Sequence, residues 1–386
     1  MITKNIKFKN FKKKVSTKKI LIDLKKLLKE NNEIINSLGR TYKDNYNNKI
    51  IKKYKKFKDI NIIGMGGSTL GTESIYRFLE HKIKKNFTFF DNLNPNPIVT
   101  KKKRGPLNLI VSKSGNTIET ISNVNIILKK SKNHNIFITE NKKSYLLMLA
   151  EKLKAEIVHH NNFIGGRYSV LSEVGMLPAE LMGLNKNSFK QVNNLIKNKK
   201  FINSLVLNVG NLLYFLNTKR LNSIILNYDQ KSFALFQWYQ QLMAESLGKK
   251  GIGFLPTIST MPKDNHSLMQ LYLDGPKNSF FTFFSVKEKK SSNISNDQIL
   301  ASHSYLKNKN IYKIMAAQKN AAENVFKKKN IPFRSFEIIN RSEKSLGELF
   351  CFFILETILL GRALKVNPYD QPSVELIKQE TKKILI

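Results

Sequence analysis

Between residues 60 and 160 the chain alternates short apolar runs with turns and helical stretches, and this pattern constrains its fold most strongly. The apolar runs lie at residues 60–63, 107–111 and 136–139. Strands that alternate with helices build a parallel sheet with helices on both faces, because each connection must cross a face before the next parallel strand begins. The pattern therefore predicts an α/β unit over this part of the chain.

A second round of the same alternation follows. Its predicted strands lie at residues 223–226, 252–255, 280–286 and 332–338. Residues 232–247 have helical spacing between the first two of these strands, and a helical segment at 188–217 would connect the two rounds. We therefore predict an α/β protein with two flavodoxin-like, mainly parallel sandwich domains. A basic, helical lead-in would precede them, and a helix would follow them at the C-terminal end.

Length and composition are consistent with a two-domain protein of a reducing compartment. A chain of 386 residues is longer than the roughly 250–300 residues at which single hydrophobic cores stop growing. The basic N-terminal segment is not followed by an apolar stretch long enough for a signal peptide, so export is not expected. The most apolar run, 349–360, contains Glu356 and is shorter than the roughly 20 residues of a spanning helix, which predicts a buried helix. Because Cys351 is the only cysteine, we expect no disulfide and a cytoplasmic location.

The formal net charge of +38 raises the question of an anionic partner. Nucleic acids and anionic membranes both attract such a surface. Only eight of the 66 basic residues are Arg, the residue that contacts phosphates and guanines with two parallel hydrogen bonds, and the lysines are spread along the whole chain. We therefore expect neither a nucleic-acid nor a membrane partner. The simpler interpretation is a solvated, Lys-rich surface that attracts small anions.

Two loops that follow predicted strands are candidates for binding phosphate. GMGGSTLG, at 64–71, has glycines that would let backbone amides approach an anion at the start of a helix. It is neither a dinucleotide fingerprint nor a Walker loop, and a tight turn without a ligand is the alternative. SKSGNTIET, at 112–120, has four hydroxyl residues around Lys113, which suits a phosphate dianion, although an ordinary N-cap would explain it as well.

Two further segments contain charges that acid–base chemistry requires. In GGRYS, at 165–169, Arg167 follows paired glycines and could stabilise an oxyanion, with a solvated or salt-bridged side chain as the alternative. In QWYQQLMAESLGKKGIG, at 237–253, Gln241 and Glu245 share one helical face near the end of the predicted helix. A carboxylate near the negative end of a helix is poorly placed for stability, which favours a role as general base.

The last two segments are ambiguous on their own. In DNHSLMQ, at 264–270, His266 has an acidic residue and a hydroxyl residue nearby, although a lone histidine is more often structural. In NPYDQPSVELIK, at 367–378, a turn-rich stretch opens a helix on which Glu375 and Lys378 lie three residues apart. An exposed salt bridge is the simpler interpretation of that pair.

These six segments, in this order, resemble the motifs of the glucose-6-phosphate isomerase (phosphoglucose isomerase) family. The family has a GIGGSxLG loop, an SKTxTTxET or SKSGTTxET phosphate loop, GGRxS, ESxGK, a His-Ser pair and NPxDQxGVExxK. The resemblance covers roughly residues 58–382 and implies two sugar-isomerase (SIS) domains in a homodimer with active sites at the subunit interface. The implied division is a helical lead-in at 1–57, a first SIS domain at 58–187, linking helices and a second SIS domain at 188–366, and an active-site helix at 367–386.

The resemblance also implies which residues bind a substrate. The family's binding positions correspond to Gly66, Gly67, Ser68, Ser112, Lys113, Ser114, Thr117 and Gln371. The first three belong to the glycine loop, near the sugar. The three hydroxyl residues of the second loop would bind phosphate with Lys113 beside them, and Gln371 would hold the sugar hydroxyls.

The implied reaction is the reversible interconversion of D-glucose 6-phosphate and D-fructose 6-phosphate through ring opening and an enediolate. Glu245 would move the proton between adjacent carbons, and Arg167 would stabilise the enediolate. His266, contributed by the other subunit, and Lys378 would move the protons that open the ring. Because these steps need only acids, bases and a positive charge, neither a metal nor another cofactor is expected.

Two departures from the family pattern affect the expected substrate range. Asn116 stands where a hydroxyl residue is usual, and Pro372-Ser373 replaces the pair that usually precedes Val-Glu. Neither change removes a chemical group named above, so a dual phosphoglucose/phosphomannose isomerase is the main alternative. A non-enzymatic SIS regulator that senses a sugar phosphate is a second one, which the joint presence of the four catalytic candidates argues against.

Overall fold

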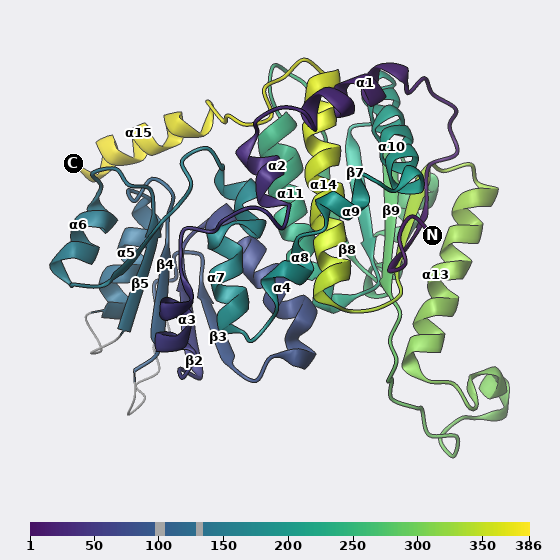
Figure 1. The fold of residues 1–386 in the computed structure, drawn as a ribbon. Helices are drawn as coiled ribbons and strands as arrows, with labels where there is room; N and C mark the ends of the chain where they lie inside the picture. The colour runs from purple at the N-terminus through teal and green to yellow at the C-terminus, as the bar shows by residue number, and fades with distance from the viewer. Residues whose placement is uncertain (97–104, 129–133) are drawn as a thin grey trace.

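Within residues 1–96, 105–128 and 134–386, which the computed structural model describes, the chain forms two five-stranded sheets covered by helices (Figure 1). The first sheet has the order β3-β2-β4-β5-β6 and is parallel throughout. Its strands are β2 (Asp59–Ile63), β3 (Asn86–Phe90), β4 (Leu107–Val111), β5 (His134–Thr139) and β6 (Glu156–His159). The prediction of a parallel α/β unit over this part of the chain is confirmed.

The second sheet has the order β1-β10-β9-β7-β8. It is parallel except at one edge, where β1 runs antiparallel to β10. Its strands are β1 (Ile6–Lys9), β7 (Asn222–Asn227), β8 (Leu255–Thr260), β9 (Ser279–Val286) and β10 (Phe333–Ile338). The predicted α/β class with two mainly parallel sheets is therefore confirmed.

The N-terminal lead-in contains helices, as predicted, and also one strand that the sequence did not predict. It contains α1 (Lys18–Leu27), α2 (Glu33–Ser37) and α3 (Asn48–Tyr54), but it begins with β1, which belongs to the second sheet. Residues 6–9, IKFK, alternate apolar and basic side chains, so that Ile6 is fully buried while Lys7 is exposed. Four alternating residues are too short a pattern to stand out in a basic segment.

Two other elements are shifted from their predicted positions. β8 begins at Leu255 instead of 252, because Gly251 and Gly253 have positive φ angles of 72° and 144° and form a turn there. The predicted helix at 188–217 is divided into three helices. These are α8 (Lys186–Phe189), α9 (Val192–Leu195) and α10 (Lys199–Asn217).

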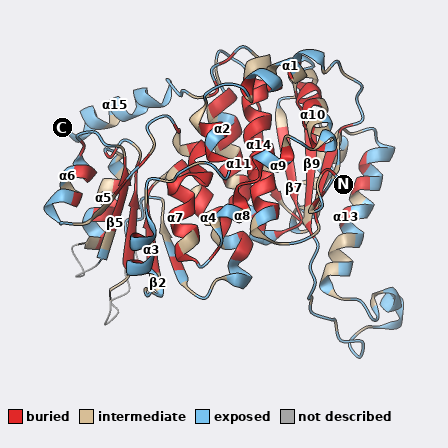
Figure 2. Ribbon diagram, in the orientation of Figure 1, coloured by how far each residue is buried: buried red, intermediate tan, exposed pale blue. Residues whose placement is uncertain are grey.

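The helices arrange the two sheets in successive layers (Figure 1). α5 and α6 cover the outer face of the first sheet, and its inner face packs against α4 and α7. α4 contacts α11, which packs with α14 on the inner face of the second sheet, and α12 and α13 cover the outer face. The largest hydrophobic core lies between the sheets, where Figure 2 shows the densest burial. The bounds are α4 (Leu70–Leu79), α5 (Ile118–Leu128), α6 (Tyr145–Lys152), α7 (Glu173–Leu181), α11 (Phe233–Leu247), α12 (Met269–Asp274), α13 (Ile311–Lys328), α14 (Glu343–Ala363) and α15 (Val374–Leu385).

α14 contains the most apolar segment of the chain. Its residues 345–361 are all buried between neighbouring helices and the second sheet. The apolar run at 349–360 is therefore a buried helix, as predicted. Among the helices that the structure describes, none combines the length and the apolar character needed to span a bilayer.

A buried ion pair ties α14 and α11 to the second sheet. Arg334 on β10 and Glu356 on α14 form a salt bridge, and both side chains are fully buried. The Tyr239 hydroxyl on α11 donates to Glu356 Oε1 over 2.6 Å and accepts from Arg334 Nη2 over 3.0 Å. Asn208 on α10 accepts from Arg334 Nη1 over 2.9 Å. Because buried charges are tolerated only when they are paired and hydrogen-bonded, this network fixes α11 against the sheet.

We expect Arg334→Met to lower the free energy of unfolding by about 3–5 kcal/mol, because it leaves the buried Glu356 carboxylate without a counter-charge. The double variant Arg334→Met/Glu356→Leu should recover much of this loss, since both charges are then removed. Urea unfolding followed by circular dichroism measures both effects. A double variant no more stable than the single one would contradict this explanation.

Candidate active site

The loops after β2 and β6 meet the helix α11. The β2 loop contains the short turn η1 (Gly66–Ser68), and the chain after β6 leads into the turn η3 (Gly166–Leu171). η1 and η3 contact each other, and both contact α11. Ligands of open α/β sheets bind outside the carboxyl ends of the strands. This junction is therefore the candidate active site.

Glycines allow these loops to touch along their backbones. A Cβ atom at Gly67 would lie 2.3 Å from the carbonyl carbon of Gly166, which is too close for any side chain. Gly66 has a φ of 55°, and a Cβ atom there would lie 3.0 Å from Nε2 of Gln241. The structure thus brings Gly66 and Gly67 against η3 and α11, with Ser68 in the same turn.

Arg167 is only 2% exposed, and each of its five N–H groups has an acceptor. Nε donates to Ser246 Oγ over 2.7 Å. Nη1 donates to Glu245 Oε1 over 2.9 Å and to Gln371 Oε1 over 2.8 Å, and Nη2 donates to two backbone carbonyls within 368–370. Since a guanidinium stays protonated in proteins, Arg167 places a fixed positive charge beside the Glu245 carboxylate.

Glu245 is held at both carboxylate oxygens. Its side chain is 23% exposed, Oε1 accepts from Arg167, and Oε2 accepts from Gln241 Nε2 over 2.8 Å. Gln241 lies one turn earlier on the same helix, and its Oε1 is buried with no hydrogen-bond partner among the described residues. A ligand hydroxyl could satisfy this oxygen. The four-residue spacing of Gln241 and Glu245 is the signal for this pair in the sequence. Of the two, only Glu245 was predicted as a site residue.

The hydroxyl-rich loop after β4 forms a compact turn at the start of α5. Ser112 Oγ lies 2.9 Å from Thr117 Oγ1 and accepts from the Gly115 amide over 3.2 Å. Gly115 has a φ of 66°, and a Cβ atom there would lie 2.2 Å from Ser144 Oγ. Ser114 is exposed in the same turn. The structure therefore places Ser112, Ser114 and Thr117 at one helix N-terminus, as the sequence predicts.

Two other residues of this loop reach across to neighbouring segments. Asn116 Oδ1 accepts from the Tyr145 amide over 3.0 Å and so binds the first turn of α6. Asn116 stands where the family motif has a hydroxyl residue, and this contact gives its side-chain amide a structural role. Lys113 Nζ donates to the carbonyl of Asn162 over 2.9 Å and lies 3.5 Å from Glu140 Oε1, which directs its charge towards the loops after β5 and β6.

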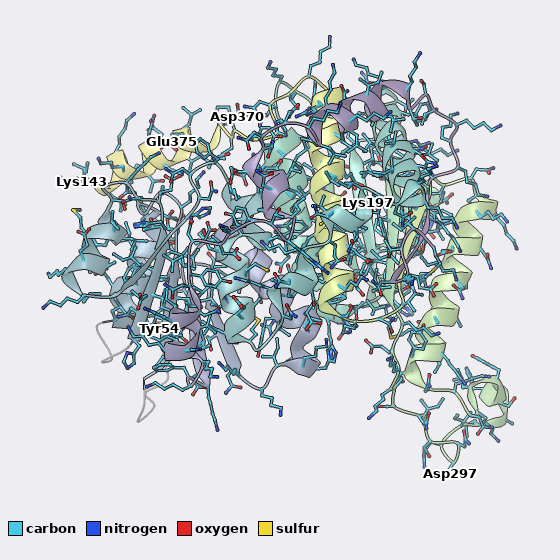
Figure 3. All side chains as sticks on the ribbon, in the orientation of Figure 1. Tyr54, Lys143, Lys197, Asp297, Asp370 and Glu375 are labelled. Atoms are coloured by element: carbon cyan, nitrogen blue, oxygen red, sulfur yellow. The ribbon has the colours of Figure 1, made fainter. Side chains whose placement is uncertain are left out.

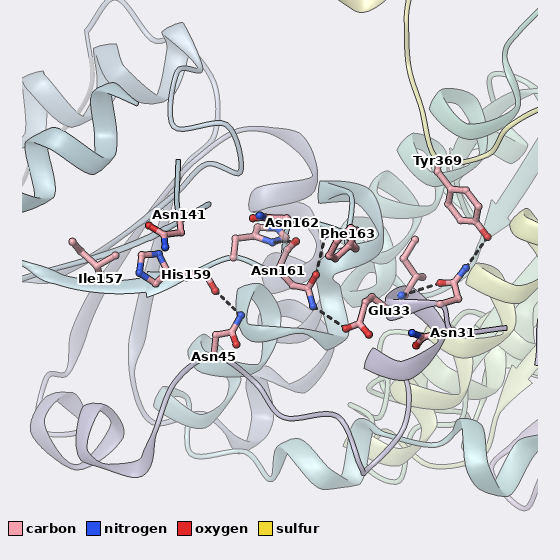
Figure 4. A pocket seen from close by; sticks show the side chains of 13 residues that line it. Asn31, Glu33, Asn45, Asn141, Ile157, His159, Asn161, Asn162, Phe163 and Tyr369 are labelled. Atoms are coloured by element: carbon pink, nitrogen blue, oxygen red, sulfur yellow. Dashed lines mark hydrogen bonds between the residues drawn. The ribbon is translucent and has the colours of Figure 1, made fainter. Parts of the chain in front are cut away.

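A groove of about 920 Å³ lies along these loops (Figure 4). Its lining is rich in amides and includes Asn162, the exposed Phe163 and Tyr369. His160 also lines it, and burial lowers the pKa of this histidine to about 4, so that it is neutral at physiological pH. None of the predicted site residues is among the described residues that line the groove. The groove lies beside the candidate active site at Tyr369, whose ring centre lies 5.9 Å from that of Tyr168 in η3.

Lys249 anchors the segment that precedes the C-terminal helix. Its ammonium donates to the carbonyl of Asn367 and to Asp370 Oδ1, the latter over 2.6 Å. The hydrogen bond from Lys249 lowers the pKa of the Asp370 carboxyl. Because two carbonyls of the same segment accept from Arg167, the next residue, Gln371, is placed beside the guanidinium.

His266 and Lys378 do not contact Glu245 among the described residues of one chain. His266 follows the turn η5 (Lys263–Asn265) after β8 and is exposed. Lys378 lies on α15, which has no buried residue, and its ammonium lies 3.1 Å from Glu375 with the lysine side chain 62% exposed. Figure 3 marks Glu375 on this helix beyond Asp370. The structure thus brings together the Arg167, Glu245 and Gln371 side chains and leaves His266 and Lys378 apart from them.

A sequence profile for the family Phosphoglucose isomerase matches residues 11–386 of this chain. The chain belongs to the phosphoglucose isomerase family. The glucose-6-phosphate isomerase of Methanocaldococcus jannaschii is 30% identical over 359 residues, which cover 86% of both chains. The glucose-6-phosphate isomerase of Mycoplasmopsis pulmonis is 31% identical over 356 residues, covering 84% of this chain and 82% of that one. The resemblance predicted from the motifs is therefore confirmed.

Solved structures support the fold of this phosphoglucose isomerase family member. A hypothetical protein from Thermus thermophilus superimposes with a TM-score of 0.83 at 23% identity, covering 96% of this chain and 94% of that one. A glucose-6-phosphate isomerase from Chlamydia trachomatis gives a TM-score of 0.69 at 19% identity and covers 92% and 73%, respectively. A tagatose-6-phosphate ketose/aldose isomerase from Escherichia coli gives 0.52 at 14% identity, with 92% and 91% covered. These likenesses confirm the expected α/β fold with two mainly parallel sheets.

We expect Lys249→Met to loosen residues 367–371, because the segment then loses the ammonium group that binds it just beyond the end of α11. Amide hydrogen exchange in this segment should accelerate by roughly tenfold or more, as for a locally opened region. The pKa of Asp370 should rise towards its ordinary value in an NMR titration. Lys250→Met is the matched control, since Lys250 is adjacent, exposed and of the same charge. Unchanged exchange in Lys249→Met would show that the segment is held without Lys249.

Proposed function

We propose that this protein interconverts glucose 6-phosphate and fructose 6-phosphate by opening the sugar ring and moving a proton through an enediolate. The observation that carries the proposal is the pairing of the partly exposed Glu245 carboxylate with the buried Arg167 guanidinium over 2.9 Å. Moving a proton between adjacent carbons needs one base and a positive charge beside the oxygen that becomes negative. This pair supplies both, and the names of the relatives from M. jannaschii and M. pulmonis agree with the reaction.

Glu245 is the proposed base. Its two hydrogen bonds orient the carboxylate before a substrate arrives, which reduces the entropy lost on reaching the reactive geometry. Arg167 Nη1 also donates to Gln371, an exposed residue whose amide a substrate oxygen can replace. The developing oxyanion would then lie against the guanidinium. The unpaired oxygen of Gln241 would accept a sugar hydroxyl.

The hydroxyl-rich loop is the proposed phosphate site. Ser112, Ser114 and Thr117 surround the N-terminus of α5, where free amides and the helix dipole favour an anion. Lys113 adds a positive charge beside this loop. The glycine loop at Gly66–Ser68 and Gln371 would bind the sugar between the phosphate and Glu245.

His266 and Lys378 are the proposed acid and base for ring opening. Because both are exposed and apart from Glu245 in one chain, we propose a homodimer in which His266 of the partner subunit completes each site. Each proposed step is a proton transfer or a charge stabilisation by a side chain, so the mechanism uses neither a metal nor a redox cofactor. We place the enzyme in the cytoplasm, acting in glycolysis and gluconeogenesis.

Glu245→Gln should bind fructose 6-phosphate with a similar Kd but lose turnover by about 10²- to 10⁴-fold, the range of one acid–base group. The fold should be preserved, because the Gln241 amide can rotate and offer its unpaired oxygen to the new amide. A coupled assay for glucose 6-phosphate measures the rate, and calorimetry measures binding. Glu151→Gln, on the exposed side of α6, is the control and should keep the wild-type rate. A Glu245→Gln enzyme within tenfold of that rate would refute the assignment.

Mixing two inactive variants tests whether the site is shared between subunits. Glu245→Gln and His266→Ala should each be nearly inactive alone. In a hybrid dimer, the intact Glu245 and the intact histidine meet in one of the two sites if the histidine crosses the interface. Co-expression should then restore roughly a quarter of the wild-type activity at random association of two-fold symmetric dimers. No recovery in hybrids isolated by two affinity tags would place His266 in the site of its own chain.

A further inference from the structure

A second cavity lies at the amino end of β10, where the helices α10 and α13 also end. Its volume is about 360 Å³, and Phe333, the first residue of β10, lines it. It contains none of the residues proposed to act in the isomerase reaction. Three segments far apart in the sequence build it, namely the end of β1 with the residues after it, the end of α10 and the chain from α13 to β10. We name it the basic-aromatic pocket.

The pocket gathers positive charge. Five of its 13 lining residues are basic, against 66 of 386 in the whole chain, and none is acidic. These five are Lys9, Lys12, Lys13, Arg220 and Lys327. Lys9 is paired with Glu323 over 2.8 Å, whereas the other four form no ion pair within the described parts of the chain. The pocket therefore has four positive charges without a protein counter-charge.

The two helix ends do not account for these charges. α10 ends at Asn217 and α13 at Lys328, and each helix end contributes roughly half a negative charge. Together they would offset about one of the four unpaired cations. An excess of positive charge is left, which an anion of the solvent or a ligand has to balance.

The floor of the pocket is apolar and buried. Phe11 and Phe215 are each 3% exposed, and their ring centroids lie 4.9 Å apart. Phe11 fixes the segment that follows β1, so that the neighbouring lysines extend from an anchored backbone. Tyr214 and Phe333 are partly exposed beside this floor, and Lys13 Nζ lies 4.9 Å from the centre of the Tyr214 ring. Partly exposed aromatic side chains beside a cationic rim suit a ligand with a flat ring and an anionic group.

We propose that the basic-aromatic pocket binds a nucleoside phosphate, with the base against the partly exposed Tyr214 and Phe333 side chains and the phosphates at the lysine rim. The volume lies at the lower end of the range for small-molecule sites, about 300–1,000 Å³, which fits one nucleotide. A polynucleotide would instead need an open groove that follows its backbone. Asn330 presents an exposed amide at the rim for the edge of the base. This site is independent of the proposed isomerase reaction.

Calorimetric titration of the full-length protein with ATP, adenosine and tripolyphosphate tests the proposal. ATP should bind saturably at one site per chain. Adenosine and tripolyphosphate should each bind at least tenfold more weakly, because adenosine lacks the phosphates and tripolyphosphate lacks the base. Lys12→Ala/Lys13→Ala should weaken ATP binding by roughly tenfold, as expected for loss of hydrogen bonds to a charged group. Lys49→Ala/Lys52→Ala is the control, since it removes the same charge from exposed positions on α3.

A second variant separates the aromatic contribution from the charge. Tyr214→Leu should weaken ATP binding but leave tripolyphosphate binding unchanged, with the thermal midpoint checked for folding. Excess fructose 6-phosphate should leave ATP binding unchanged. Any of four results would overturn the proposal: no saturable ATP binding, an equal loss in the control variant, displacement of ATP by fructose 6-phosphate, or tripolyphosphate binding as tightly as ATP. Displacement of ATP by polyuridylate, with an affinity that rises with its length, would also overturn it in favour of a nucleic-acid surface.

Discussion

The arrangement of the candidate site depends on the burial of the Arg167 guanidinium. A buried cation is stable only when its hydrogen bonds are fully paired, and the acceptors of Arg167 come from α11 and from the segment that ends at Gln371. Its own backbone carbonyl accepts from Trp238 Nε1 over 3.0 Å. Burying this one side chain therefore forces three distant segments into a single geometry. Because Gly67 has no side chain, the glycine loop can contact the backbone of Gly166, and this close approach is part of the same geometry.

A second buried ion pair holds the same helix from its other side. Tyr239 binds the Arg334–Glu356 pair in the second half of the protein, and Glu245, six residues further along α11, binds Arg167 from the first half. α11 is thus fixed between the two sheets by two charged networks. A carboxylate on a helix held in this way has little freedom to rotate away. Such preorganisation is what a general base requires, because misplacement by about 1 Å can cost two orders of magnitude in rate.

The sequence predicts those strands and loops of this protein that a local or periodic pattern of residues marks. The apolar runs of β2, β4, β5, β7 and β9 are long enough to be recognised, and the glycine and hydroxyl loops follow directly from them. The four residues of β1 are too few, and only pairing with β10 makes them a strand. The contact of Lys249 with Asp370 joins residues 121 positions apart, and the unpaired oxygen of Gln241 depends on packing of the glycine loop. Neither leaves a periodic signal.

The distribution of positive charge along the chain also differs from its distribution in the folded structure. Lysines that are evenly spread along a sequence suggest a surface without a charged patch. Folding nevertheless brings Lys12, Arg220 and Lys327 to one cavity, because β1, α10 and α13 all end there. The cations at the candidate active site are of a different kind, since Arg167 is buried and paired with a carboxylate. The basic residues behind the net charge of +38 therefore stand in different environments. Its functional part has to be sought where the tertiary structure leaves cations together without acidic neighbours.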